Sequence, residues 1–460
     1  MLTRDYLKEK KVLIVGLGKS GLAALYALCP MGAKVYVQDS KKKEELDAGL
    51  VEYIDNNCAG SFLGKMPDNI TTFDMMVLSP GVDPEKDFVV EAKKAGCDIV
   101  GELELAYRLA KGTFIGITGT NGKTTTTTLV GEIFKASGRK TNVVGNIGEP
   151  VITASLKSTD EDWMITEVSS FQLQTTTEFK PYISAILNLT PDHLNRHHTM
   201  EGYGAAKARI WENQDENGVF IINADDPVLN ELCYKTIMPQ PKAKIIPFSR
   251  VKELEYGAFL LNDSLVYKKE DGTVIEFCKK QELKIIGNHN IENALAAALM
   301  ASCAGIDRET IREVLISFKG VEHRIEFCGE KNGVRFYNDS KGTNVDAAVI
   351  ALKAIEKNII LIAGGDSKGQ EFDDLIDYFP GRVKHMVLLG RDAHFISEAC
   401  ERKGFSDFSF HKDMEECVRA AFEMAEPGDT VLLSPACASW DMYKNFEARG
   451  DHFKNIVKEL

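Results

Sequence analysis

The run GTNGKT at residues 119–124 is the clearest chemical signal in this chain, and it lies between a predicted strand and a predicted helix. Glycines let a backbone wrap around a polyphosphate, a lysine neutralises its charge, and a threonine hydroxyl can coordinate Mg²⁺. Because Ile117 stands where the longer GxxxxGK[ST] pattern has its first glycine, a plain glycine turn with a solvated lysine is the alternative. The run predicts an ATP loop made of Gly119, Thr120, Asn121, Gly122, Lys123, Thr124 and Thr125.

A second glycine-rich turn, GLGKSG at residues 16–21, follows the first predicted strand, and Asp39 ends the next one. Alone, this pattern favours a dinucleotide-binding fold. Since the chain already carries an ATP loop, a pocket for another diphosphate, such as a UDP-sugar, fits both observations better. A turn required only for tight strand–helix packing is the alternative. Ser79, in Ser79-Pro80-Gly81, is expected at the same carboxyl edge of the sheet.

Two groups suited to metal binding follow strands of the middle region. Glu167 comes after the run 163–165, and His193 comes after the run 183–189. Adjacent parallel strands would deliver both side chains to the edge that holds the phosphate loop. A carboxylate and an imidazole there suit Mg²⁺ bound to phosphates, whereas a helix-capping Glu and a surface His are the alternative.

Lys207 lies on a predicted helix among aromatic and aliphatic neighbours. A free ammonium group is a poor neighbour for Mg²⁺. Burial and nearby cations disfavour the charged form of an amine, and the neutral amine can take up CO₂ to become a carbamate anion. A carbamate at Lys207 and a surface lysine both remain open.

Two lysine loops follow strands in the last third of the chain. Lys341 lies in YNDSKGTN and Lys368 in GGDSKG, and the two are expected to converge on a space of anion size. Cys437, in the run 433–450, is interpreted as a small packed residue, because no His or Asp partner for a nucleophile is visible.

The elements that must position these residues alternate along the chain. Short apolar runs end in glycine or polar turns and are followed by amphipathic stretches, which is typical of βαβ units with buried parallel strands. Residues 219–285 instead contain short pieces that look antiparallel, followed by an alanine-rich helix over 290–304. We predict an α/β protein of three domains: a Rossmann-like domain over 1–101, a P-loop-type central domain with a parallel sheet plus a small antiparallel sheet over 102–320, and a Rossmann-like domain over 321–460.

Composition excludes several classes. The formal charge of −13 argues against a general nucleic-acid or anionic-membrane binder. The longest apolar stretch, 294–306, is too short to span a bilayer, and the N-terminus lacks a signal-peptide pattern. The ten cysteines show neither CxxC pairs nor zinc spacing. We expect a cytoplasmic, monomeric protein that neither binds nucleic acid nor inserts into membranes.

The ordered set of motifs closely resembles the Mur ligases over all three predicted domains, and among them the branch that adds D-glutamate. The motifs are GTNGKTT, GNIG at 145–148, EVSSFQL at 167–173, LTPDH at 189–193, GNHNIENA at 287–294, HRIE at 323–326, NDSKGTN at 338–344, GGDSK at 364–368 and SPACASWDMYKNFEARG at 434–450. The resemblance implies an ADP-forming ligase that joins D-glutamate to UDP-N-acetylmuramoyl-L-alanine through an acyl phosphate in peptidoglycan synthesis.

The resemblance also implies roles for individual residues. The ATP phosphates and one Mg²⁺ would be held by Lys123, Thr124 and Glu167, and a second Mg²⁺ by His193 and a carbamylated Lys207. The adenosine part of ATP would contact Asn290, Asn293, Arg324 and Asp339. The UDP-sugar would contact Lys19, Ser20, Ser40, Lys41, Ser79, Asn146, Ser169 and Gln172, although Lys19 and Lys41 depart from the family pattern. D-Glutamate would contact Lys341, Thr343, Lys368, Ser439 and Phe446.

Other interpretations remain open at this point. A nicotinamide-dependent oxidoreductase would explain GLGKSG and Asp39, but it leaves the ATP loop and both lysine loops without a purpose. A nucleotide switch or scaffold would bind ATP without acceptor-dependent phosphate release. A sister Mur ligase or a folylpolyglutamate synthase would share the ATP loop. The absence of a DNP[RK] motif disfavours the meso-diaminopimelate ligase.

Overall fold

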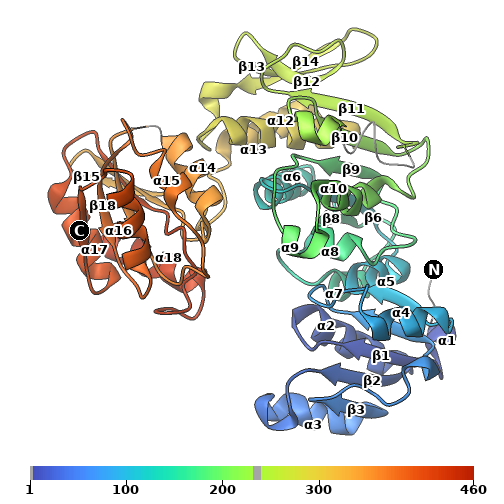
Figure 1. The fold of residues 1–460 in the computed structure, drawn as a ribbon. Coiled ribbons are helices and arrows are strands. Elements are labelled where there is room, and N and C mark those ends of the chain that lie inside the picture. The colour runs from blue at the N-terminus through green and yellow to red at the C-terminus, as the bar shows by residue number, and fades with distance from the viewer. Residues whose placement is uncertain (1–3, 232–239, 356) are drawn as a thin grey trace. The chain divides into compact units, whose positions relative to one another are not determined.

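The computed structural model describes residues 4–231, 240–355 and 357–460. Two compact units make up the chain: one contains the residues up to Lys280 together with Glu292–Leu315, and the other contains Gln281–Ile291 together with Ile316–Leu460. Figure 1 traces the chain through both units.

The N-terminal sheet of the first unit has the strand order β3-β2-β1-β4-β5, and its strands run parallel. Val12 and Ile14 of β1 enter one hydrophobic cluster, whereas Leu13 and Val15 enter another on the opposite face. Burial of both faces explains why these strands are almost continuously apolar. The strands are β1 (Lys11–Val15), β2 (Lys34–Asp39), β3 (Gly60–Leu63), β4 (Met75–Leu78) and β5 (Asp98–Gly101); the helices are α1 (Arg4–Leu7), α2 (Lys19–Leu28), α3 (Ala48–Asn57), α4 (Asp87–Lys94) and α5 (Glu102–Leu109).

The central sheet has the order β14-β13-β12-β11-β10-β9-β6-β8-β7. Its strands are β6 (Thr113–Thr118), β7 (Thr141–Gly145), β8 (Trp163–Glu167), β9 (Ile183–Ile186), β10 (Val219–Asn223), β11 (Lys244–Ser249), β12 (Gly257–Leu261), β13 (Ser264–Lys268) and β14 (Val274–Lys279). Its helices are α6 (Lys123–Ala136), α7 (Val151–Ser155), α8 (Ser170–Leu173), α9 (Leu194–His197), α10 (Met200–Ala208), α11 (Pro227–Leu229), α12 (Asn288–Cys303) and α13 (Arg308–Ser317).

The expectation of a separate small antiparallel sheet is corrected by this topology. Strands β10, β11 and β12 pair in parallel, and only β12, β13 and β14 are antiparallel, as a continuation of the same sheet. The connection 224–243 is long enough for a crossover, whereas the short turn between β12 and β13 permits only a hairpin. Strands β11 and β12 are parallel although only residues 250–256 connect them, so connection length alone does not determine the direction of pairing.

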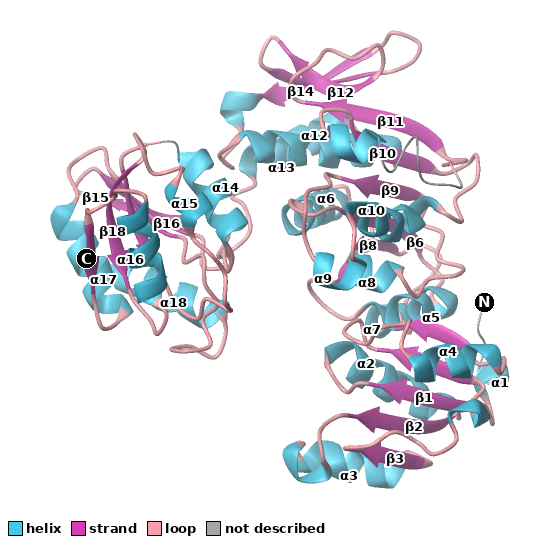
Figure 2. Ribbon diagram, viewed as in Figure 1, coloured by secondary structure: helices cyan, strands magenta, loops and turns pink. Residues whose placement is uncertain are grey.

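The C-terminal sheet of the second unit has the order β15-β16-β20-β17-β18-β19 and is parallel except for the β15–β16 hairpin. Figure 2 shows its strands among the helices α14 to α18. The strands are β15 (Glu326–Lys331), β16 (Val334–Asn338), β17 (Ile359–Ala363), β18 (Val383–Leu388), β19 (Phe408–Phe410) and β20 (Thr430–Leu433); the helices are α14 (Val345–Ile355), α15 (Asp373–Ile376), α16 (Ala393–Arg402), α17 (Met414–Met424) and α18 (Phe446–Glu459).

The predicted α/β class is confirmed, and the strands form three sheets. Within the part of the chain that the structure describes, no helix is both long enough and apolar enough to cross a membrane.

Candidate functional site

The phosphate loop turns from β6 into α6, as the sequence predicts. Gly119 and Gly122 have φ values of 151° and 82°, which side-chain-bearing residues rarely adopt. A Cβ atom at Gly122 would collide with the Asn293 side chain of α12. Glycine is therefore required at position 122 both for the backbone conformation and for the close approach of Asn293.

Asn188, which follows β9, holds the outer part of this loop. Its carbonyl accepts a hydrogen bond from Thr120 N (3.1 Å), its Oδ1 accepts one from Asn121 N (2.8 Å), and its Nδ2 donates to Asn121 O (3.0 Å). These bonds shape the loop from the neighbouring strand. Sequence analysis missed Asn188, although its position in the run LNLTPDH, directly after a predicted strand, was a usable signal.

Two lysines converge on one carbonyl of the phosphate loop. Lys123 Nζ donates to Gly119 O (2.9 Å) and Thr120 O (2.7 Å), and Lys207 Nζ donates to the same Gly119 O (2.9 Å). The Lys207 side chain is 1% exposed, and its ammonium group lies 4.5 Å from the Tyr203 ring centroid. The interpretation of Lys207 as a surface lysine is therefore wrong, because α10 buries it beneath the loop.

Glu167 ends β8, between the strands that carry Ile117 and Gly145 in register with it. It is 1% exposed, and Oε1 accepts a hydrogen bond from Asn146 Nδ2 (2.8 Å). Oε2 is buried and has no hydrogen-bond partner within residues 4–231, 240–355 and 357–460. An unsatisfied buried carboxylate oxygen is costly, so this oxygen is suited to a ligand such as a cation.

The two histidines near this region differ. His193 is exposed and packs 4.9 Å from the Phe171 ring, whereas His197 is buried and contacts Ser170 Oγ at 2.9 Å. Burial, followed by the charge of Lys207, lowers the pKa of His197 to about 4. Among the described residues, no three His, Cys, Asp or Glu side chains are close enough together to hold a metal ion by themselves.

The predicted UDP-sugar residues of the N-terminal sheet lie on loops that converge at its carboxyl edge. Asp39 joins two of them, because its carboxylate accepts hydrogen bonds from Leu17 N (2.7 Å) and Lys41 N (2.9 Å). Ser79 Oγ donates to Gly16 O at 2.8 Å. Ser40 and Lys41 are exposed, and Ser20 is half-buried.

Lys19 points away from its own loop. Its Nζ donates to Gly148 O at 2.7 Å, on the loop between β7 and α7. Ser169 and Gln172 contact each other: Gln172 Oε1 accepts hydrogen bonds from Ser169 N and Oγ (both 2.9 Å), which caps the short helix α8.

In the second unit, each lysine of the two loops lies over an aromatic ring. Lys341 Nζ is 5.7 Å from the Phe446 centroid, and Lys368 Nζ is 4.8 Å from that of Trp440. An isolated antiparallel β-bridge between the backbones of Asp366 and Ala438 joins the Lys368 loop to the segment that carries Trp440 and the buried Ser439. Sequence analysis missed Trp440. Thr343 is half-buried beside Lys341.

Asp339 is enclosed after β16. Its oxygens accept hydrogen bonds from Ser434 Oγ (2.7 Å) and Ile325 N (3.2 Å), and burial raises its pKa to about 7. The charge of Arg324 opposes this rise. Arg324 Nε is buried and, within the described chain, has no hydrogen-bond partner. An unpaired guanidinium nitrogen beside a buried carboxyl group is suited to an anionic ligand.

The asparagines of α12 have separate partners. Asn290 Nδ2 donates to Ile286 O (2.7 Å), and Asn293 Oδ1 accepts from Thr126 Oγ1 (3.1 Å). Both asparagines are buried.

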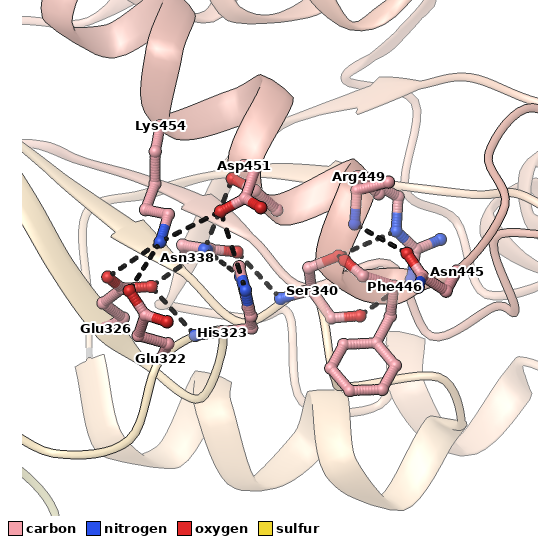
Figure 3. A network of polar contacts seen from close by, with 12 residues as sticks. Glu322, His323, Glu326, Asn338, Ser340, Asn445, Phe446, Arg449, Asp451 and Lys454 are labelled. Carbon is pink, nitrogen blue, oxygen red and sulfur yellow. Dashed lines mark hydrogen bonds and ion pairs between the residues drawn. The ribbon is translucent and has the colours of Figure 1, made fainter.

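Figure 3 shows a polar network, not predicted from the sequence, that ties the NDSKGTN loop to α18. The buried Arg449 donates through Nε to Ser340 Oγ (3.0 Å) and through Nη2 to Ser340 O (2.8 Å), and Ser340 Oγ donates to Phe446 O (2.8 Å). The network places Phe446 beside Lys341. Cys437 is packed, as predicted: burial raises its pKa to about 12.

The chain matches family models along most of its length. Residues 10–101 match the Mur ligase MurD-like N-terminal domain, residues 117–301 match the Mur ligase middle domain, and residues 323–437 match the Mur ligase glutamate ligase domain. The chain therefore belongs to the Mur ligase family. The oxidoreductase interpretation of GLGKSG and Asp39 loses its support.

Curated relatives give the branch of the family. The chain is 48% identical over 457 residues to a UDP-N-acetylmuramoylalanine–D-glutamate ligase of Alkaliphilus oremlandii, with 99% of each chain covered. It is 47% identical over 455 residues to the enzyme of the same name from Clostridioides difficile, again with 99% of each covered.

Solved structures show the same fold. The UDP-N-acetylmuramate–alanine ligase of Thermotoga maritima superposes with a TM-score of 0.58 at 18% identity, over 98% of this chain and 100% of the other. A pseudomurein peptide ligase from Methanothermus fervidus gives 0.57 at 18% identity, with the same coverage.

Proposed function

We propose that this protein is an ATP-dependent ligase that joins D-glutamate to UDP-N-acetylmuramoyl-L-alanine, with release of ADP and phosphate, at the cytoplasmic stage of peptidoglycan synthesis. The names of the full-length relatives support this substrate pair. The structural observation that carries the proposal is the convergence of Lys123 and the buried Lys207 on Gly119 O, within a glycine loop at the start of α6. Lys123 and the N–H groups at the start of α6 supply positive charge where a triphosphate would bind, and the buried Lys207 lies directly beneath this loop.

Phosphate transfer comes first in the proposed reaction. A carboxylate resists attack by an amine because oxide is a poor leaving group, so the terminal carboxylate of the acceptor first attacks the γ-phosphorus of ATP, and ADP leaves. Lys123 and the loop N–H groups stabilise the charge that develops on the phosphoryl oxygens. The amine of D-glutamate then attacks the acyl phosphate, loses a proton and displaces phosphate, leaving an amide.

The residues present fit Mg²⁺. The free Oε2 of Glu167 is a hard oxygen ligand in a buried position, and Mg²⁺ commonly uses one or two carboxylates together with substrate phosphates and water. We assign one ion to Thr124 and Glu167 and a second to His193 and a carbamylated Lys207. Bound Mg²⁺ would neutralise the phosphate oxygens.

The carbamate is supported by the position of Lys207. Burial and a neighbouring cation both disfavour an ammonium ion. Lys207 is 1% exposed, and its Nζ contacts the same carbonyl, Gly119 O, as the Nζ of Lys123. A neutral amine can add to CO₂ and lose a proton, which gives an anion suited to a metal.

The remaining substrates are assigned by domain. Residues 1–101 would bind the UDP-sugar, residues 102–320 ATP, and residues 321–460 D-glutamate. The UDP-sugar ligands are Lys19, Ser20, Ser40, Lys41, Ser79, Asn146, Ser169 and Gln172; the adenosine ligands are Asn290, Asn293, Arg324 and Asp339; the D-glutamate ligands are Lys341, Thr343, Lys368, Ser439 and Phe446. We further propose that the enzyme is monomeric.

A phosphate-release assay tests the function. Purified protein receives ATP, Mg²⁺ and UDP-N-acetylmuramoyl-L-alanine, with each candidate amino acid supplied in turn. We expect phosphate release with D-glutamate and not with L-glutamate, L-alanine or diaminopimelate. Release that prefers another amino acid would assign the protein to a different branch, and ATP binding without acceptor-dependent release would favour a nucleotide switch.

A further inference from the structure

The loop of residues 145–150, at the end of β7 and before α7, is held by one side chain of α2, and the segment after it is held by one side chain of α5. Lys19 Nζ donates to Gly148 O (2.7 Å), and Glu102 Oε1 accepts from Ile152 N (2.7 Å) in the first turn of α7. Glu102 is 3% exposed. Lys19 thus contacts the middle of this loop, and Glu102 contacts the first turn of the helix that follows it.

From inside, the same loop contacts Glu167. Asn146 N donates to Glu167 O (3.0 Å), and Asn146 Nδ2 donates to Glu167 Oε1 (2.8 Å). A Cβ at Gly145, whose φ is 108°, would collide with Glu167 O. A shift of the loop would therefore shift the Glu167 carboxylate.

We propose that Glu102 is a positioning residue for the Glu167 carboxylate: it fixes α7 and loop 145–150 so that Asn146 occupies Oε1 and leaves Oε2 open to the metal ion. The inference rests on the proposed function through the assignment of Glu167 as a metal ligand. Lys19 belongs to the proposed UDP-sugar loop and donates a hydrogen bond to Gly148 O, so loop 145–150 also links acceptor binding to the metal site.

The electrostatics of Glu102 agree with a specific role. Burial raises its pKa to about 7, while the Ile152 and Val151 N–H groups and the charge of Lys19 act in the opposite direction. A carboxyl group this buried is costly to retain merely to cap a five-residue helix, for which a short polar side chain is sufficient.

Glu104, two residues further along α5, provides a matched control. It is fully buried and accepts hydrogen bonds from the backbone N–H groups of Thr177, Glu178 and Phe179. Like Glu102 it is a buried carboxylate on α5 that accepts backbone N–H groups, but it also pairs with Arg108 Nε (2.7 Å) and holds a different segment of the central domain. Its loss should lower stability without a selective effect on the metal site.

The experiment compares full-length wild type with Glu102→Ala, Glu102→Gln and Glu104→Gln. Hydrogen exchange of peptides covering 145–155, without ligands, reports on the loop. The Mg²⁺ concentration for half-maximal rate and the binding of Mn²⁺ in the presence of ADP, followed by electron paramagnetic resonance, report on the metal site.

For Glu102→Ala we expect faster exchange in 145–155 and roughly 10-fold weaker Mn²⁺ and Mg²⁺ affinity, with the KM for D-glutamate nearly unchanged. Glu102→Gln, which keeps one acceptor oxygen, should lie between Glu102→Ala and wild type, and it carries the test if the alanine variant does not fold. Unchanged metal affinity in both Glu102 variants, or an equal loss in Glu104→Gln, would overturn the inference. If wild type shows no D-glutamate-dependent phosphate release, the proposed function is refuted. Mn²⁺ binding and hydrogen exchange of the peptides covering 145–155 then still test the positioning role of Glu102.

Discussion

Loops 16–21 and 119–124 look alike in sequence and differ in structure. Both follow a buried parallel strand, open a helix and carry one lysine. Lys123 folds back onto the carbonyls of its own loop, whereas Lys19 reaches out to Gly148 O. Glycine spacing thus sets the path of the backbone, but contacts from outside the loop set where the cation lies.

The contacts that hold the two loops explain this difference. Loop 16–21 is tied at Leu17 N by Asp39 and at Gly16 O by Ser79, so polar groups of β2 and β4 converge on it. Loop 119–124 is held by Asn188 on one side and approached by Asn293 on the other. Loop 16–21 is hydrogen-bonded to the neighbouring loops of its sheet. In loop 119–124 the lysine, Lys123, lies over the carbonyl groups of its own loop.

Substitution of each lysine tests whether the two loops have different roles. Lys123→Ala should lower the rate of phosphate release about 10³-fold, because it removes a cation from the oxygens of the transferred phosphoryl group. Lys19→Ala should raise the KM for the UDP-linked acceptor by less than about 10-fold, because it weakens one loop contact. Steady-state phosphate release measures both, and equal losses in the two variants would show that the loops are not specialised.

Lys207→Ala should come next, with a loss of about 10²-fold or more, since it removes the proposed carbamate beneath loop 119–124. Added short carboxylic acids should partly restore the rate by supplying the missing carboxylate. Lys135→Ala, on the exposed side of α6, is the control and should behave as wild type. Wild-type activity in Lys207→Ala would remove this lysine from the site.

The lysine loops of the second unit extend the comparison to lysines that lie over aromatic rings. Lys341→Ala and Lys368→Ala should each raise the KM for D-glutamate roughly 10- to 100-fold and leave that for ATP within about twofold, because each removes a cation from the proposed D-glutamate pocket. Lys353→Ala is matched, since Lys353 Nζ lies 4.5 Å from the Tyr378 ring centroid outside the proposed pocket. Unchanged D-glutamate saturation would contradict the pocket.

The smallest effect concerns two strand-end carboxylates. Asp39 accepts two backbone N–H bonds, whereas the enclosed Asp339 has a pKa raised to about 7. Between about pH 4 and 7 the native state retains a proton that the unfolded chain has lost, so stability falls as pH rises through this window, by up to about 4 kcal/mol. The Asp339→Asn variant has no titrating group at this position, so its stability should not show this dependence on pH. The melting temperature of the variant minus that of wild type should therefore be more positive at about pH 8 than at about pH 5. A difference in melting temperature that does not change with pH would contradict the raised pKa of Asp339.

Much of the site followed from residue order. Glu167 ends β8 and Lys341 lies in the loop after β16, at the strand ends where βαβ topology predicts them, because the carboxyl ends of parallel strands share one edge. The burial of Lys207 did not follow, since the packing of α10 beneath the loop depends on contacts distant in sequence. The bond between Ser169 and Gln172, and the choice between an exposed His193 and a buried His197, were equally invisible to pattern analysis.

By itself, the order of residues determined the alternating α/β elements, the two glycine turns and the strand ends that carry charged side chains, because these depend on local periodicity and backbone sterics. Three features depend on the tertiary structure: the parallel pairing of β10 with β11, the hydrogen bonds of Arg449 to Ser340, and the hydrogen bonds of Lys19 and Glu102 to the segment 148–152. Each of these joins segments far apart along the chain, and packing, which local pattern does not encode, determines which of them meet.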